Sequence, residues 1–184
     1  MASAPMAPEA MLARLRAGGV TAEPIYAALT HQPGADADAL RTALTRLLAA
    51  SLRPADRGLA RWLLQQETTA LAAAGHGVSE TLYTLIAAVA RYADPDDVLL
   101  LWRAREATPE TRAGVDVEQF ARAGVERVRR RLQTLIRTDG PRAAEASGAL
   151  QWLDEGLAAG ASSDLAGYFA WSDERFGLHV SGPT

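Results

Sequence analysis

The chain has 184 residues, a formal net charge of -3 at pH 7 and no cysteine. This length fits one domain that can bury a substantial core without disulfides or metals. The absence of cysteine excludes disulfides, thiol chemistry and zinc–thiolate sites. The slightly acidic balance gives no general attraction to nucleic acid or to acidic membranes.

The basic residues other than histidine are all arginine, and lysine and asparagine are both missing. This bias is typical of a GC-rich coding sequence, so a bacterial origin is expected. Glu9, Arg14 and Arg16 stand where a secretory signal needs an unbroken apolar core. The most apolar windows, 82–89 and 98–102, are far shorter than the roughly 20 residues of a membrane-spanning helix. We therefore expect a cytoplasmic protein that does not cross a membrane.

From residue 8 onward, apolar residues recur at helical spacing. The sequence predicts helices over 8–17, from Thr21 to Gly34, along a leucine stripe at 40–52, and over about 55–74, where Leu59, Trp62 and Leu63 mark the apolar face. Gly75 then ends the fourth helix, because glycine readily takes the left-handed conformation at a helix C-terminus.

Ser79 is placed to cap a fifth helix that buries Leu82, Leu85 and Val89. The sequence Asp94-Pro95-Asp96-Asp97 then combines an N-cap acid, a proline at the first helical position and carboxylates in the first turn. Residues 98–102, which follow it, are apolar on every side and are expected to be among the most buried.

The spacing predicts a brief helix from Pro109 to Gly114 and then one helix over 117–136. Asp116 and Gln119 have the form of a capping box at its start. On its outer face, Glu118 precedes Arg122, and Glu126 precedes Arg130, by four residues, the favourable order for ion pairs. Two further helices are expected, one that places Ala146, Leu150, Leu153 and Leu157 on one face and one that begins near residues 163–164.

No segment has the alternation of a β-strand, so the sequence predicts an all-α fold of eight or nine helices, as stacked antiparallel hairpins or as a bundle. The third helix is expected to pair with the fourth, the fifth with the sixth and the seventh with the eighth. Residues 1–7 are expected to form a loose arm, residues 8–180 a single helical domain and residues 181–184 a tail.

The segment Ala93-Asp94-Pro95-Asp96-Asp97-Val98 resembles the aspartate–proline turn between paired helices in HEAT-like α-helical repeats. The resemblance extends over residues 36–160. It implies a right-handed stack of hairpins with a concave binding surface, and it implies no particular ligand.

The aspartates at 94, 96 and 97, with Asp116 and Glu118 next along the chain, form the densest acid cluster. Several carboxylates together are typical of a divalent-cation site, but both groups lie where helix caps belong. The sequence therefore favours capping, and no metal or cofactor is expected.

An arginine-rich face is predicted from Arg122, Arg129, Arg130 and Arg137, which project opposite the apolar stripe of their helix. Such a face binds phosphates or is a solvated surface with ion pairs. The acidic net charge favours the second interpretation.

Gln66 falls on the apolar stripe of its helix, where a buried amide must find hydrogen bonds. It therefore joins an internal network or lines a small-molecule pocket with Trp62 and Tyr83. The network is the favoured interpretation.

Four aromatic residues gather near the C-terminus: Tyr168, Phe169, Trp171 and Phe176. They are candidates for a partner-binding surface, because aromatic and arginine side chains dominate interface hot spots. The alternative, which is favoured, is a tail that folds back and closes the end of the stack.

No nucleophile elbow, glycine-rich phosphate loop or zinc-protease helix is present in the sequence. The sequence therefore favours a non-enzymatic helical interaction domain that binds a protein or peptide partner. The alternative is a nucleic-acid-binding or DNA-repair-type repeat protein, because HEAT-like DNA glycosylases hold DNA on a basic concave face. The oligomeric state stays open.

Overall fold

A computed structural model describes residues 6–18, 22–30, 35–160 and 164–179. The predicted ends of the second helix at Thr21 and Gly34, the residues of the predicted arm before Met6 and the tail at 181–184 lie outside these ranges. Within them the fold is all-α and contains no β-strand, which confirms the predicted fold class. No described helix is both long and apolar enough to span a bilayer.

The described helices follow one another with short connections. They are α1 (Pro8–Ala17), α2 (Glu23–Leu29), α3 (Ala35–Ala50), α4 (Arg57–Ala74), α5 (Glu80–Arg91), α6 (Val98–Arg105), α7 (Pro109–Gly114), α8 (Val117–Ala121), α9 (Val125–Thr138), α10 (Gly140–Ala158) and α11 (Leu165–Arg175). Two short 3-10 helices, η2 (Pro54–Asp56) and η3 (Pro95–Asp97), lead directly into α4 and α6.

Most of the predicted helix ends are present. Gly75 ends α4 in the left-handed conformation at φ 74°, and the Ser79 hydroxyl accepts a hydrogen bond from the Leu82 amide at 2.9 Å. The Asp94 carboxylate accepts from the Asp96 amide at 2.9 Å, so it caps η3, the turn that opens α6. These caps satisfy backbone donors that the helices themselves leave unpaired.

The single helix predicted over 117–136 is wrong, because Gly124 separates α8 from α9 at φ 92°. Glycine adopts this conformation without steric cost. The break is not visible in the sequence pattern, because the apolar periodicity continues across it. The predicted capping box is also absent. Asp116 makes no side-chain cap, and both Asp116 and Gln119 bind α11 instead.

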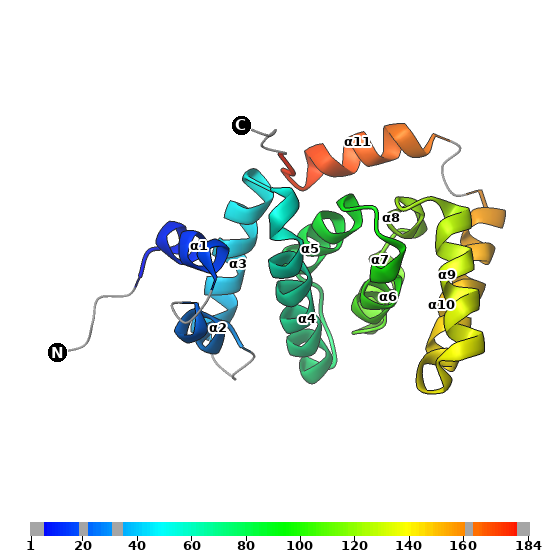
Figure 1. The fold of residues 1–184 in the computed structure, drawn as a ribbon, viewed down its shortest axis with the longest axis horizontal. Helices are drawn as coiled ribbons and strands as arrows, with labels where there is room; N and C mark the ends of the chain where they lie inside the picture. The colour runs from blue at the N-terminus through cyan, green and yellow to red at the C-terminus, as the bar shows by residue number, and fades with distance from the viewer. Residues whose placement is uncertain (1–5, 19–21, 31–34, 161–163, 180–184) are drawn as a thin grey trace.

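The stack places helices side by side along its length, from α1 to α10 (Figure 1). α4 packs along α5 and α9 along α10, whereas α3 packs mainly against α1 and α5. The pairing of the seventh with the eighth predicted helix is therefore present, whereas the members of the other two predicted pairs pack mainly against other helices.

The core runs through the stack and is built mainly of leucine, alanine and valine side chains. Its members on α6 include Val98, Leu99 and Leu101, but Leu100 and Trp102 are only half-buried. The all-round burial predicted for residues 98–102 is therefore wrong. Leu100 and Arg103 lie on the more exposed side of this eight-residue helix, and Trp102 packs against Trp152 of α10.

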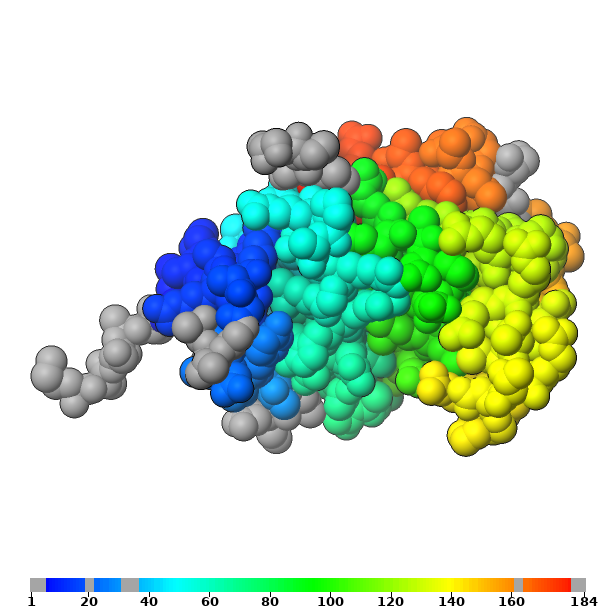
Figure 2. Space-filling model, viewed as in Figure 1, coloured from blue at the N-terminus to red at the C-terminus, as the bar shows by residue number. Residues whose placement is uncertain are grey.

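After α10 the chain turns back, and α11 runs along one edge of the stack toward α3 (Figure 1). Residues 164–179, which we call the C-terminal strap, end in two backbone hydrogen bonds to the end of α3. The Leu52 amide donates to the His179 carbonyl at 3.1 Å, and the His179 amide donates to the Ala49 carbonyl at 2.9 Å. Figure 2 shows α11 lying directly on the atoms of the stack.

Candidate functional site

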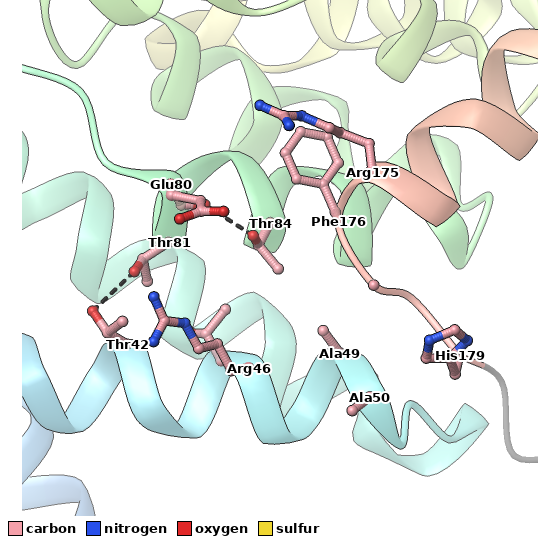
Figure 3. Close-up of a pocket in the computed structure, with 12 residues that line it drawn as sticks. Thr42, Arg46, Ala49, Ala50, Glu80, Thr81, Thr84, Arg175, Phe176 and His179 are labelled. Carbon is pink, nitrogen blue, oxygen red and sulfur yellow. Dashed lines mark hydrogen bonds between the residues drawn. The ribbon is translucent and has the colours of Figure 1, made fainter.

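A cavity of about 290 Å³ lies where the C-terminal strap meets α3 and α5. Its walls come from three parts of the chain that are far apart in sequence. They are Thr42, Thr45, Arg46, Ala49 and Ala50 of α3; Glu80, Thr81 and Thr84 of α5; and Arg175, Phe176, Gly177 and His179 of the strap. Figure 3 shows these three walls around the cavity.

The α3 wall follows from helical spacing. Thr42, Thr45, Arg46 and Ala49 stand at i, i+3, i+4 and i+7, so they share one face of the helix. The buried leucines Leu44 and Leu48 stand on the neighbouring stripe and fix the rotation of α3 in the core. The cavity face is therefore set by the leucine stripe that the sequence analysis recognised.

Hydroxyl groups join the two helices in the cavity wall. The Thr42 and Thr81 hydroxyls lie 2.9 Å apart, and the Thr84 hydroxyl donates to the Glu80 carbonyl at 2.9 Å. Thr45 is only 2% exposed, and its Oγ1 has no hydrogen-bond partner. A buried polar atom without a partner is energetically costly, because it has lost its hydrogen bonds to water.

Two charged groups of the same sign line this cavity without a carboxylate partner. Most arginines of the described residues form ion pairs. Neither Arg46 nor Arg175 forms an ion pair or a side-chain hydrogen bond within the described ranges. Arg46 reaches from α3 toward Thr81, and Arg175 comes from the end of α11 (Figure 3). Arginine binds carboxylate and phosphate oxygens through a planar fork of donors, so this arrangement suits an anionic group.

Polar contacts hold the strap to the stack beside this cavity. Asp173 accepts two hydrogen bonds from Arg122, both at 2.7 Å, and pairs with Arg91. Burial, with the neighbouring Arg91 charge as a second cause, lowers the pKa of Arg122 to about 10, which leaves it charged at neutral pH. The fully buried Ser172 hydroxyl accepts from Gln119 at 2.7 Å.

Tyr168 adds a further contact between the strap and the stack. Its hydroxyl donates to the Asp116 carboxylate at 2.8 Å. Burial, followed by this hydrogen bond, raises the pKa of Tyr168, so the phenol keeps its proton. The strap is therefore fastened by one ion-pair cluster and two hydrogen-bonded side chains.

Two of the four arginines of the predicted arginine-rich face are held by carboxylates. Arg122 binds Asp173, and Arg129 donates to Asp154 at 2.7 Å and to Glu126 at 2.6 Å. Glu126 therefore pairs with Arg129 in place of Arg130. Arg130 and Arg137 are exposed and form no ion pair with any residue that the structure describes.

The four C-terminal aromatic residues all belong to the strap. Trp171 is 53% exposed, and its ring lies 5.6 Å from that of Tyr168. The Arg122 guanidinium lies 5.0 Å from the ring of Phe169, and Phe176 lines the cavity. The strap thus runs along the stack, whereas the sequence analysis favoured a tail that closes its end.

The three residues of the predicted small-molecule pocket lie in different surroundings. Trp62 packs edge-on against Tyr26 at 4.7 Å between ring centroids, and Gln66 is half-buried. Tyr83 lines a separate cavity of about 30 Å³ beside Gly114. The buried polar residue of this part of α4 is Glu67, one position after the glutamine that the sequence analysis singled out.

The acid cluster around η3 binds arginines and backbone amides. Asp97 is buried and pairs with Arg61 and Arg57 of α4. Burial raises the pKa of Asp97, and the hydrogen bond from Arg61 opposes this effect. In the described part of the chain, no three potential ligands lie close enough together to hold a metal ion.

Sequence reasoning missed Thr45, Arg46 and Arg175 as site residues. A polar stripe at residues 42, 45 and 46, beside the leucine stripe, was the one available signal. Nothing in the pattern shows that Arg175 returns to this stripe. No protein-family model, curated protein or solved structure matches this chain. The HEAT-like resemblance therefore stays a prediction.

Proposed function

We propose that this protein is a non-enzymatic helical interaction domain that binds an acidic segment of a protein partner in the cavity between α3, α5 and the strap. The observation that carries the proposal is that Arg46 and Arg175, two arginines without ion-pair partners, line the same cavity. Although the chain is acidic overall, these two guanidinium groups give the cavity lining donors for a carboxylate.

The other residues that line the cavity are consistent with a polypeptide ligand. Ala49, Ala50 and Phe176 supply apolar surface for the stem of an acidic side chain. The Thr45 hydroxyl, which has no hydrogen-bond partner, lies buried in the α3 wall of the cavity. Apolar walls with a few placed polar groups are the usual composition of a binding pocket.

The alternative, a nucleic-acid-binding protein, has less support. It requires arginines that converge on one surface. Arg103, Arg122 and Arg129 are each held by carboxylates, namely Glu145, Asp173, Glu126 and Asp154. These pairs reduce the positive charge offered to a phosphate backbone, and Arg130 and Arg137 stay exposed without ion pairs within the described residues.

The test is a fluorescence-anisotropy titration with a labelled ten-residue peptide of alternating glutamate and alanine. A peptide with glutamine at the glutamate positions is the control. We expect the acidic peptide to bind and the glutamine peptide to bind at least about tenfold more weakly, since each lost charge-assisted hydrogen bond is worth about 1.5–3 kcal/mol. Free inorganic phosphate as competitor distinguishes a site for any small anion from one that needs a peptide.

The matched variants are Arg46→Ala/Arg175→Ala and Arg130→Ala/Arg137→Ala. Each pair removes two arginines without ion-pair partners, so both change the net charge equally. Only the first pair should abolish binding of the acidic peptide. Equal weakening by both pairs, or equal affinity for the two peptides, would show that binding is not at this cavity.

A variant of Glu80 tests the sign of the charge on the ligand. It lines the same cavity, and its carboxylate forms no ion pair within the described residues. If the ligand group is anionic, Glu80 repels it, and Glu80→Gln should tighten binding of the acidic peptide several-fold. Weaker binding by this variant would point to a ligand that carries a positive charge.

A further inference from the structure

The cavity has two walls of different origin. α3 and α5 belong to the packed stack and bury leucines such as Leu44, Leu48 and Leu85. The opposite wall is the end of the strap, which supplies Arg175, Phe176 and His179. One of the two free arginines is therefore in place only when the strap lies on the stack.

Asp173 is the centre of the contacts that hold the strap there. Its carboxylate joins Arg122 of the α8 C-terminus and Arg91 of the α5 C-terminus. Its carbonyl accepts a hydrogen bond from the Leu178 amide at 2.8 Å, which turns the chain toward α3 after α11. Asp173 does not itself line the cavity, yet it lies two residues before Arg175.

We infer that Asp173 is a positioning residue for the cavity, and that binding of an acidic ligand and docking of the strap stabilise each other. The inference rests on the proposed function of the cavity. A ligand held by both Arg46 and Arg175 contacts the stack and the strap at once. Such a ligand therefore binds the protein with the docked strap more tightly than the protein with the undocked strap. Because the coupling is reciprocal, docking of the strap raises the affinity for the ligand by the same factor by which the ligand favours docking.

The charge of Asp173 makes the two explanations predict opposite changes in affinity for an acidic peptide. Asp173→Asn removes one negative charge and frees Arg91 and Arg122, so simple electrostatics predicts tighter binding of an acidic peptide. If Asp173 positions the strap, the variant should bind the acidic peptide more weakly. The apparent affinity falls in proportion to the fraction of molecules in which the strap is docked. The direction of the change separates the two explanations.

The experiment measures binding of the same labelled glutamate–alanine peptide and hydrogen exchange of strap amides. For the wild type, the peptide should slow exchange of amides in residues 165–179. For Asp173→Asn, exchange should be faster without ligand, and affinity should fall about fivefold or more, the usual lower range of such couplings. Asp154→Asn is the matched control. It removes one negative charge from a partner of Arg129, and this variant should bind the peptide with an affinity equal to or slightly higher than that of the wild type.

Tyr168→Phe is the milder second variant, because it removes the hydrogen bond to Asp116 without a change of charge. Its affinity should lie between those of the wild type and Asp173→Asn, with circular dichroism showing that both variants remain folded. Unchanged or tighter binding by Asp173→Asn overturns the inference, as does faster strap exchange at unchanged affinity. A wild type that does not bind the acidic peptide overturns the proposed function, and the inference with it.

Discussion

A buried arginine–glutamate pair joins the first helices to the middle of the stack. Arg41 of α3 is 1% exposed and donates to Glu67 of α4 at 3.0 Å and to the Leu29 carbonyl at 3.2 Å. The other oxygen of Glu67 accepts from the Ser79 hydroxyl at 2.6 Å. One glutamate thus contacts α3 and the N-cap of α5 from within α4.

Glu67→Ala should lower the free energy of unfolding by about 3 kcal/mol, because a buried charge that loses its partner is strongly destabilising. Arg41 keeps Asp38, which limits the loss. The control is Glu145→Ala, which breaks the exposed pair with Arg103 and should cost less than about 1 kcal/mol. Urea denaturation of both variants measures the two values, and equal losses would contradict the structural importance of the buried pair.

The sequence predicts a polar group on the apolar side of α4 at Gln66, one residue before the buried Glu67. The buried face of α4 is Leu59, Ala60, Leu63, Leu64 and Glu67. The half-buried Trp62 was counted as core, and it rotated the predicted stripe by one position. The sequence does not distinguish a large aromatic residue at the edge of a buried helix face from one in the core.

At the scale of the helices, close contact between α10 and α8 depends on a missing side chain. A Cβ built on Gly156 would lie 3.0 Å from Val117 Cγ2 and 3.1 Å from Val117 Cβ. Val117 is β-branched and stiff, so it cannot easily rotate away. α8 therefore packs where only glycine permits it.

Gly156→Ala should destabilise the protein by about 1 kcal/mol, because overpacking costs about 1–3 kcal/mol and helix propensity returns up to about 1 kcal/mol. Gly58→Ala is the control, since nothing lies within 4 Å of its built Cβ. That change should leave the melting temperature equal or higher. Calorimetry on both variants checks the opposite signs, and a stabilised Gly156→Ala would show that α8 shifts freely.

Helix existence was predictable because caps and periodicity are local signals. Gly75, Ser79 and Asp94 act where the sequence indicated. The break at Gly124 and the pairing of helices were not predictable, because the apolar stripe runs through the break and pairing depends on how each turn redirects the chain. The cavity depends on a contact between residues more than a hundred positions apart, which no local pattern records.

Across the whole molecule, most of the described arginines are paired with carboxylates. Arg61 with Asp97, Arg131 with Asp96 and Arg103 with Glu145 are examples from three helices. Paired arginines contribute little to long-range attraction of a polyanion. The molecule as a whole should therefore discriminate a single acidic segment from a nucleic-acid backbone.

Labelled duplex DNA should not bind appreciably at physiological salt. Affinity for duplex DNA comes largely from counterion release by free basic side chains, and the net charge here is -3. The measurement is a titration at roughly 50 and 150 mM salt, a range over which such affinities fall steeply. Micromolar binding with a steep salt slope, lost in Arg130→Ala/Arg137→Ala, would favour the nucleic-acid alternative.

The bonds between His179 and the end of α3 also set an order of events during synthesis. α3 and α5 are synthesised before the strap, so the residues of the first wall of the cavity exist before those of the second. Contacts between such distant residues form late in folding. The cavity is therefore complete only in a chain that has been synthesised as far as residue 179 and whose strap lies on α3.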